Sequence, residues 1–441
     1  MKTPDPNAPF SRRHFVRASA AASAVALAHE WIPSNVHAAP GNTIKLGLVG
    51  CGGRGTGAAA QAMNAGDEIH LTAVCDVERA TAEEKVALLA KQKPDQTKVS
   101  PDKIYASFDG YKAVIAECDV VILATSPGFR PLHFEEAVNQ GKHVFMEKPV
   151  ATDVAGIKRV LAAAEVAKQK NLKVGVGLQR RHQPTYVEFV KRIRDGALGD
   201  VKYLRAFWDG SARPGREREP DETELQYQIR NWYYFTWLSG DHNVEQHVHN
   251  LDVANWVMDA HPVKAQGMGG REVRNQKING QIFDHHFVEY EYANGVRLWS
   301  QARQIPGCWR SVSEHVTGTK GDANFEARQF EITGENATTK RLRTGEDGHQ
   351  LEHFPLFEAI RKDLPHNEAE HGANATMTAI LGRMSNYSGQ VVTWDDAMAS
   401  DQKLVPDNLA SFDSEPPVKP DAEGWYPVAV PGVTKPFEVW Y

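Results

Sequence analysis

Residues 44–57 read IKLGLVGCGGRGTG, and this stretch decides the fold of the first half of the chain. Its apolar run, residues 44–50, is bounded by glycine and predicts a buried strand. Residues 55–66 then predict a helix that ends at glycine. The turn between them fits the pattern G-x-G-x-x-G, which brings a strand end and a helix N-terminus to a phosphate group. The sequence therefore predicts a dinucleotide-binding turn made by Gly50, Gly52, Gly53, Arg54 and Gly55.

An acidic residue stands where such a unit needs one. Asp76 ends the second predicted strand, residues 69–76, and follows Gly55 by 21 residues. A carboxylate at this place accepts hydrogen bonds from ribose hydroxyls, which favours NAD over NADP. Arg79 keeps NADP open, because an arginine there can meet a 2′-phosphate. The expected cofactor is NAD or NADP, with NAD favoured.

Short apolar strands and helices alternate through residues 43–150. This alternation, with strands apolar throughout, predicts a doubly wound parallel sheet of the Rossmann type with helices on both faces. After a helix at 151–170 another strand is expected at 172–179. The strands of the first domain are expected at 44–50, 69–76, 103–108, 119–126 and 143–149.

The pattern changes in the second half of the chain. Three stretches alternate aromatic and β-branched residues with polar ones, which predicts an open and mostly antiparallel sheet. They are 201–210, 281–304 and 323–334. Helices are expected at about 245–258 and at 376–389. We therefore expect the fold class to be α/β, with an α+β substrate and oligomerisation domain over 151–404.

The two ends of the chain are interpreted separately. Arg12 and Arg13 precede a mildly apolar run, and a small-x-small cleavage site follows at residues 36–38. This pattern resembles a twin-arginine export signal, a pathway that moves folded proteins with cofactor inside. We therefore exclude residues 1–38 from the fold and expect a periplasmic or otherwise exported protein. The proline-rich residues 405–441 are expected to form an arm over the surface or over a neighbouring subunit.

Composition excludes several classes of partner. The formal net charge is −6 and no basic block is present, so nothing supports nucleic-acid binding. No stretch after the signal reaches the 18 apolar residues typical of a membrane span. The four cysteines show no C-x-x-C pair and no disulfide spacing, so we expect them to be small buried residues.

With residues 119–151, DVVILATSPGFRPLHFEEAVNQGKHVFMEKPVA, the chain resembles the Gfo/Idh/MocA oxidoreductases. The resemblance implies an NAD(P)-dependent oxidoreductase that transfers a hydride from a sugar, polyol or sugar derivative. It also implies a homodimer or homotetramer formed through the sheet of the second domain. It places Lys148 beside the nicotinamide as a catalytic residue, before a proline that is cis in some members. The cofactor contacts that it implies are Thr125, Ser126, Pro127, Glu147 and Lys148.

The family's second catalytic motif corresponds to residues 239–256, SGDHNVEQHVHNLDVANW. The resemblance makes His249 the base and Glu245 its orienting acid or proton acceptor, with Glu where the family often has Asp. On one continuous helix these two residues share a face. Asp252 then either fixes the histidine tautomer or caps structure.

Three interpretations in this region stay open. The first concerns His242, Glu245, His247 and His249, which have metal-ligand types; on one helix 242, 245 and 249 would face together. Hydrogen bonding to sugar hydroxyls or among the histidines is the alternative, and we assign no metal. The second concerns Arg180 and Arg181, which either line the cleft or are solvated. The third concerns the aromatics at 231–237, which either stack on a sugar or pack in the core.

The motifs together predict a sugar or polyol oxidoreductase. An exported enzyme cannot draw on free nucleotide, so we expect NAD(P) to be tightly bound. One alternative is a redox-neutral glycoside hydrolase that oxidises a sugar carbon transiently, eliminates the glycosidic group and returns the hydride. A protein that binds a sugar or nucleotide without turnover is the other.

Overall fold

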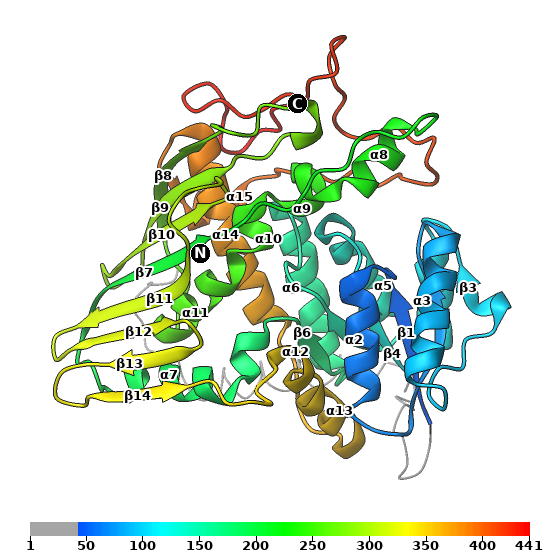
Figure 1. Ribbon diagram of the computed structural model, residues 1–441, viewed down its shortest axis with the longest axis horizontal. Coiled ribbons are helices and arrows are strands. Elements are labelled where there is room, and N and C mark those ends of the chain that lie inside the picture. The colour runs from blue at the N-terminus through cyan, green and yellow to red at the C-terminus, as the bar shows by residue number, and fades with distance from the viewer. Residues whose placement is uncertain (1–42) are drawn as a thin grey trace, which may run out of the picture. The chain divides into compact units, whose positions relative to one another are not determined.

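The structure is a computed structural model that describes residues 43–441. The predicted signal, residues 1–38, lies outside the described residues. The described residues belong to one compact unit that contains two β-sheets, one of six strands and one of nine. Figure 1 shows the strands of the parallel sheet in blue to teal, and the second sheet mostly in green and yellow. The predicted α/β fold class is confirmed.

The first sheet is parallel throughout, as its apolar strands predicted. Helices cover both of its faces, which is why the strands are apolar on both sides. The strand order is β3 (Ile104–Tyr105), β2 (Ile69–Cys75), β1 (Ile44–Val49), β4 (Val120–Leu123), β5 (His143–Met146) and β6 (Val174–Val176). One face is covered by α2 (Gly53–Met63), α3 (Arg79–Gln92) and α13 (His353–Lys362). The other is covered by α4 (Gly110–Glu117), α5 (Arg130–Asn139) and α6 (Val154–Gln169).

The parallel sheet continues past residue 150, the limit expected for the first domain. β6 pairs in parallel with β5 after α6 has crossed over the sheet. Such a crossover returns the chain to the same sheet, because a right-handed βαβ unit packs its helix back onto the strands that it joins. The domain limits themselves stay a prediction.

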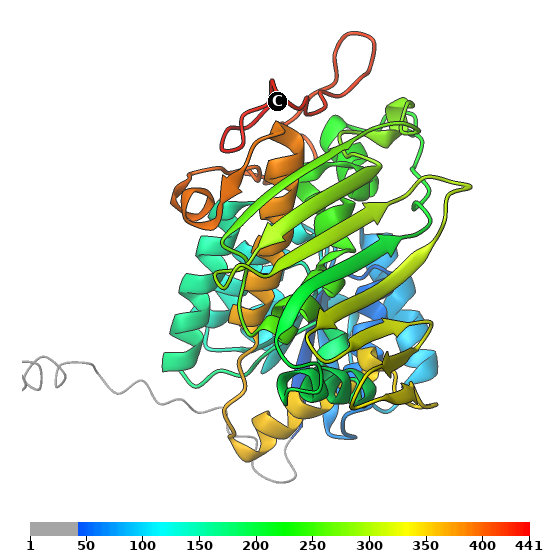
Figure 2. The same cartoon turned by 90° about the vertical axis from the view of Figure 1, so that its left-hand side faces the viewer.

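The second sheet is mixed, with one parallel pair, β7 and β10, among antiparallel neighbours. Helices α11 (Val248–Met258) and α14 (Ala369–Ser388) pack against one face, and Figure 2 shows the opposite face turned to the viewer with no helix over it. The strand order is β14 (Thr338–Arg341), β13 (Gln329–Ile332), β12 (Asp322–Glu326), β11 (Ser311–Gly318), β7 (Val201–Asp209), β10 (Arg297–Arg303), β9 (His285–Glu291), β8 (Lys264–Gly270) and β15 (Val392–Thr393).

The remaining α-helices are short. Their bounds are α7 (Pro184–Arg194), α8 (Glu224–Arg230), α9 (Thr236–Ser239), α10 (His242–Glu245), α12 (Gly348–Leu351) and α15 (Trp394–Ala399). The late helix, α14, begins at Ala369 rather than at the expected residue 376. Its first turns contain Gly372 and Asn374, which have weak helix propensity, but the helix is buried along most of its length and packing overrides propensity.

The C-terminal arm lies on its own chain (Figure 1). Thr223 Oγ1 donates to the Phe412 carbonyl at 2.7 Å, and Gln228 Nε2 donates to the Val418 carbonyl at 2.8 Å. Val418 is buried in one apolar cluster with residues of α8 and α9. The arm therefore covers a part of the protein's own core.

Three of the cysteines are buried as expected. Cys51, Cys75 and Cys118 lie in the core around the parallel sheet, and all four cysteines are free thiols. Burial raises the pKa of Cys75 and of Cys118 to about 12. Among residues 43–441, no helix has the length and apolar character needed to cross a membrane.

Buried histidines make the fold sensitive to acid. Burial lowers the pKa of His133, His247 and His353 to about 3. These rings stay neutral in the folded protein, whereas in the unfolded chain they take up protons below about pH 6.5. We expect each to reduce the free energy of unfolding by about 2 kcal/mol between pH 7 and pH 5. Glu352, whose buried carboxyl has a pKa raised well above its ordinary value, acts in the opposite direction.

Urea midpoints measured at pH 7, 6 and 5 check this prediction. The midpoint should fall with pH, and His353→Phe should make the fall shallower. His371→Phe is the matched control, because His371 is exposed. A midpoint that does not change between pH 7 and pH 5 contradicts the prediction.

Candidate active site

The phosphate turn joins β1 to α2 with the geometry that its glycines predicted. Gly50 has a φ of 95°, and a Cβ there would lie 2.6 Å from the Thr125 nitrogen. A Cβ on Gly55 would lie 2.0 Å from the Gly50 carbonyl oxygen, so helix and strand end are in close contact. At Gly52 and Gly53 a Cβ would meet nothing within 4 Å, which leaves open space in front of the helix N-terminus. The turn thus fits a phosphate group approaching the backbone.

Asp76 lies beside this turn at the end of β2. Its carboxylate accepts the N–H of Cys51 at 2.7 Å and that of Glu78 at 3.1 Å. Arg79, the residue that kept NADP open, donates instead to the Ile104 carbonyl at 3.0 Å and pairs with Glu83. The acidic groups Asp76 and Glu78 are therefore adjacent here, while the arginine is bonded to β3.

A pocket opens at the carboxyl ends of β1, β2 and β4. The structure places several predicted cofactor residues in its lining: Gly50, Gly52, Asp76, Thr125 and Ser126. Pro127 is buried next to it at the start of the short helix η2 (Pro127–Phe129). Ligands of open α/β sheets bind at this edge, outside the carboxyl ends of the strands.

Arg130 supports the pocket, and no motif in the sequence predicted this role. Its fully buried guanidinium donates to the carbonyls of Thr125 and Pro149. Burial lowers the pKa of Arg130 to about 10. The side chain thereby ties the loop after β4 to the loop after β5.

Arg54 and Glu147 bond to each other. Arg54 Nε donates to Glu147 Oε1 at 2.5 Å, and its Nη2 donates to Gln61 at 2.8 Å. Arg54 Nη2 also lies 3.8 Å from the buried Glu352. The guanidinium is thus engaged by carboxylates, so the backbone of Arg54 is the part left for a phosphate.

Lys148 reaches from the end of β5 to the second motif. The Lys148–Pro149 peptide is cis. Lys148 Nζ donates to the Glu245 carbonyl at 2.5 Å and lies 3.2 Å from Glu245 Oε1. The two side chains are only 14% and 11% exposed. The structure thus brings two of the predicted catalytic residues into contact.

The expectation of one continuous helix through Glu245 and His249 is wrong. Helix α10 ends at Glu245 and α11 begins at Val248, with Gln246 and His247 between them. The N–H of His249 points to the Gln246 carbonyl at 3.4 Å instead of to Glu245. The break leaves the Glu245 carbonyl without His249 as its partner, and this carbonyl accepts a hydrogen bond from Lys148.

His249 is buried next to this contact. Its ring stacks on Trp208 with 6.1 Å between ring centroids, and its Nδ1 is buried without a hydrogen-bond partner in the described structure. Burial holds the pKa of His249 well below its ordinary range, and the charges of Lys148 and Arg180 lower it further. The imidazole is therefore in its neutral form near neutral pH, the form that can act as a base.

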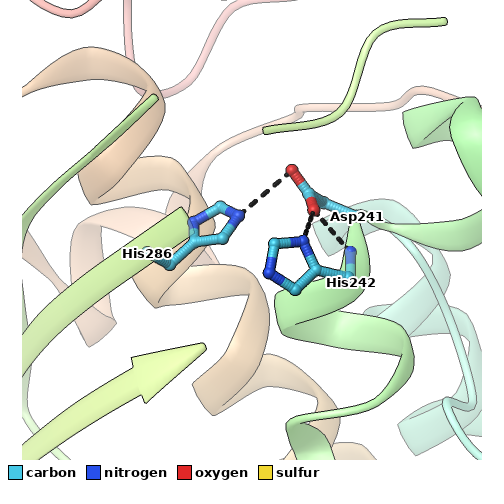
Figure 3. A group of neighbouring side chains, drawn as sticks. All are labelled: Asp241, His242 and His286. Carbon is cyan, nitrogen blue, oxygen red and sulfur yellow. Dashed lines mark hydrogen bonds and ion pairs between the residues drawn. The ribbon is translucent and has the colours of Figure 1, made fainter. Parts of the chain in front are cut away.

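The other two histidines of the motif lie elsewhere. His247 Nε2 is 2.6 Å from Ser300 Oγ, on strand β10. His242 joins Asp241 and His286, as Figure 3 shows: His242 Nδ1 is 2.8 Å from Asp241 Oδ1, and His286 Nε2 is 3.2 Å from Asp241 Oδ2. The expectation that residues 242, 245 and 249 face together on one helix is thus wrong, because the break leaves His242 and Glu245 on α10 and His249 on α11.

The cluster Asp241, His242 and His286 has ligand types for a metal ion, and all three residues are buried. The carboxylate of Asp241, however, already accepts the Phe283 N–H at 2.9 Å and the Tyr387 hydroxyl at 2.5 Å. The buried Arg274 guanidinium lies 3.5 Å from His242 Nδ1, and its charge opposes a cation there. We read the cluster as a hydrogen-bonded network that fixes the start of α10, four residues before Glu245.

The structure also shows the partners of Asp252, Arg180 and Arg181, whose roles the sequence left open. Asp252 holds Arg181 in a bidentate ion pair with distances of 2.7 to 3.0 Å, so it neither fixes the His249 tautomer nor caps the helix. Arg180 is buried against Glu314, which also accepts Asn250. Neither arginine is solvated, because each is neutralised inside the protein.

The sequence analysis also did not predict a chain of hydrogen-bonded side chains that begins at Gln246, close to His249. Gln246 Oε1 accepts the Trp208 indole N–H at 3.0 Å and the Gln304 amide at 2.7 Å. Gln304 donates in turn to the Tyr233 hydroxyl at 2.8 Å. Of the aromatics at 231–237, Tyr233, Tyr234, Phe235 and Trp237 are buried, as core packing predicted, whereas Trp232 lines the nucleotide pocket.

Comparisons with known proteins agree with this geometry. Residues 44–177 match the GFO_IDH_MocA family model, described as an oxidoreductase family with an NAD-binding Rossmann fold. Residues 186–338 match the model of the GFO/IDH/MocA C-terminal domain. Together the two matches span more than half of the chain.

Two curated relatives with detectable sequence similarity are inositol 2-dehydrogenases. The chain is 28% identical over 256 residues to an inositol 2-dehydrogenase of Cereibacter sphaeroides, covering 58% of this chain and 66%, just under two thirds, of that protein. It is 31% identical over 292 residues to an inositol 2-dehydrogenase of Salmonella paratyphi B, covering 64% and 74%.

Two solved structures share the fold. An aldose–aldose oxidoreductase from Caulobacter crescentus superposes with a TM-score of 0.64 at 17% identity, covering 80% of this chain and 100% of that one. A myo-inositol 2-dehydrogenase from Lactobacillus plantarum superposes with a TM-score of 0.60 at 18% identity, covering 80% and 99%. At these identities the likeness shows the fold alone.

Proposed function

The chain belongs to the Gfo/Idh/MocA oxidoreductase family, and from this we propose that it oxidises a hydroxyl group of a polyol or sugar with a nicotinamide dinucleotide. The observation that carries the proposal is the contact of Lys148, after the end of β5, with Glu245, the last residue of α10. This contact joins the nucleotide half of the site to the half that holds His249. The inositol 2-dehydrogenase relatives support a polyol as the substrate class.

The residues present fit a dinucleotide. The open space at Gly52 and Gly53 lies at the N-terminus of α2, where backbone N–H groups attract a pyrophosphate. Asp76 stands at the end of β2 to accept ribose hydroxyls. Strand β5, with Lys148 after it, lies on the opposite side of β1 and β4, where the nicotinamide half belongs.

Each catalytic residue has one task in the proposed reaction. When bound, NAD⁺ supplies the acceptor for the hydride that leaves the substrate carbon. Lys148 Nζ donates a hydrogen bond to the reacting hydroxyl oxygen and lowers the pKa of that hydroxyl. The neutral imidazole of His249 takes the hydroxyl proton. Glu245 holds Lys148 in place through its carbonyl and its carboxylate.

A single preparation tests the proposal. The purified protein is denatured, and released nucleotide is identified by mass spectrometry. The intact protein is incubated with myo-inositol, glucose or glycerol, and oxidised products are measured with and without added NAD⁺. Nucleotide on the protein, or NAD⁺-dependent oxidation of one substrate, supports it. A protein that neither binds a nicotinamide dinucleotide nor oxidises any polyol or sugar contradicts it.

We propose that NAD is the preferred cofactor. A 2′-phosphate on the ribose would meet the carboxylates of Asp76 and Glu78, and Arg79 is bonded away from them. We expect NAD⁺ to bind at least about tenfold more tightly than NADP⁺, which is about 1.4 kcal/mol. Calorimetric titration of nucleotide-free protein measures this ratio. Asp76→Ala should reduce it, whereas Asp67→Ala, on an exposed loop, should not. Tighter binding of NADP⁺ contradicts the prediction.

We further propose that the protein is exported by the twin-arginine pathway with its cofactor tightly bound. The support is Arg12 and Arg13 before a short apolar run, together with the fact that an exported enzyme has no free nucleotide pool. Such an enzyme oxidises one substrate and reduces a second on the same nucleotide. Cell fractionation of the wild type and of an Arg12→Lys, Arg13→Lys variant shows whether this arginine pair directs export.

We also propose a homodimer or homotetramer formed through the second sheet. Its outer face has no helix over it (Figure 2). Two large apolar side chains, one on β8 and one in the loop after β10, are exposed. Met268 is 72% exposed and Trp309 is 61% exposed. Light scattering after size-exclusion chromatography measures the mass, and a monomer contradicts the proposal.

A further inference from the structure

One wall of the nucleotide pocket comes from outside the parallel sheet. The pocket is lined on one side by the turns after β1, β2 and β4, and on another by Ile229 and Trp232. These two residues belong to α8 and to the short helix η4 (Trp232–Tyr234), in the second half of the chain. Phe108, in the loop after β3, lines the same pocket. Because β3 and β2 form the sheet edge away from Lys148, this is the adenosine end of the site.

The segment 223–234 is fixed above that end by polar contacts. Gln226 Nε2 donates to Glu78 Oε1 at 3.1 Å, which links α8 to the loop after β2. Asn231 Nδ2 donates to the Ile278 carbonyl at 2.9 Å, which links the far end of the segment to the second half of the chain. The Arg213 guanidinium lies 5.5 Å from the ring centroid of Trp232. Trp232 is thus packed in place without being buried from the pocket.

The C-terminal arm holds this segment from behind. The ring of Phe412 packs edge-on against Phe108 with centroids 5.3 Å apart, and its carbonyl accepts the Thr223 hydroxyl. Farther along, Tyr426 donates its hydroxyl proton to Glu224 at 2.5 Å. The arm therefore contacts the loop after β3 and the first residues of α8 at once, and joins the two sides of the pocket.

We propose that Ile229, Trp232 and Phe108 form an adenine-binding subsite and that the C-terminal arm latches it, so that the dinucleotide leaves slowly. The inference rests on the proposed use of a nicotinamide dinucleotide. Adenine is flat, apolar on both faces and able to stack on an aromatic ring, which suits a pocket edge made of one aliphatic and two aromatic side chains. Release then requires α8 and the arm to separate from the loops after β2 and β3.

The experiment measures release instead of turnover. Wild-type protein loaded with NADH is mixed with excess NAD⁺, and the loss of bound NADH fluorescence gives the dissociation rate. Binding of ADP-ribose, which keeps the adenosine and the pyrophosphate and lacks only the nicotinamide, is measured by calorimetry. The variants are Trp232→Ala, which removes the proposed stacking ring, and Phe412→Ala, which changes the arm and touches the pocket only through Phe108. Trp394→Ala is the matched control, because Trp394 is a part-buried tryptophan that stacks on His261 away from the pocket.

We expect Trp232→Ala to speed NADH release and to weaken ADP-ribose binding by about tenfold or more. Phe412→Ala should speed release several-fold, and Trp394→Ala should leave it unchanged. If both test variants release NADH at the wild-type rate, the inference is overturned while the proposed function stands. If the wild type binds neither NADH nor ADP-ribose, the proposed function fails as well. Should Trp232→Ala not fold, Phe412→Ala alone decides.

Discussion

Replacing Lys148 with methionine is expected to lower kcat/KM by about a thousandfold or more, while the protein keeps its fold and its nucleotide. Methionine has a similar length and no charge, so it removes the hydrogen bond to the reacting oxygen and little volume. A positioned proton donor or acceptor contributes about 10²- to 10⁴-fold to a rate. Lys148 also lowers the pKa of the neighbouring His249, so its loss affects two groups at once.

The controls separate chemistry from folding. Removing Lys148 leaves Glu245 buried without its cation, which we expect to cost about 1–3 kcal/mol of unfolding free energy. The melting temperature and the nucleotide content of the variant are therefore measured along with its activity. Lys91→Met, on the exposed side of α3, should match the wild type. Activity within tenfold of the wild type in a folded Lys148→Met protein contradicts the role given to Lys148.

Replacing His249 with asparagine is expected to lower kcat/KM by about a hundredfold or more and to change its pH profile. A base with a lowered pKa stays deprotonated below pH 6.5, so the acid limb of the wild-type profile should lie below the ordinary histidine range. The acid limb that His249 causes in the pH profile of kcat/KM should be absent in the His249→Asn variant. Measurement of kcat/KM from pH 4.5 to 9 checks both effects.

His247→Asn is the matched control. His247 lies two residues away on the same break between α10 and α11, but bonds to Ser300 on the second sheet. Its replacement should affect stability, while kcat/KM stays within about tenfold of the wild type and the acid limb keeps its position. A larger loss at His247 than at His249 would transfer the proposed base to the other histidine.

The nucleotide half of the site was predictable from local sequence. The turn after β1 depends on glycines whose lack of a Cβ is needed within a few residues of chain, at Gly50 against Thr125 and at Gly55 against Gly50 itself. Asp76 ends a strand whose apolar pattern fixes its direction. Such features follow from backbone sterics and hydrophobic period, which act over short distances along the chain.

The second half of the site was predictable in part. The resemblance placed Lys148, Glu245 and His249 together, and the contact of Lys148 with Glu245 was found. The helix through 245–249 was wrong, because nothing in VEQHVHN marks a break. Gln246, in the break, accepts hydrogen bonds from Trp208 on β7 and from Gln304 directly after β10, both far away along the chain.

By itself, the sequence determined the alternation of elements, the phosphate turn, the parallel sheet and the residue types of the site. Only the tertiary structure decided that a break separates α10 from α11, that Asp252 pairs with Arg181, that Trp232 lines the pocket, and that the C-terminal arm packs on Phe108. The physical reason is distance along the chain. Periodicity and steric limits act between near neighbours, whereas a buried charge or an open pocket edge is satisfied by whichever side chain the packing of remote segments brings to it.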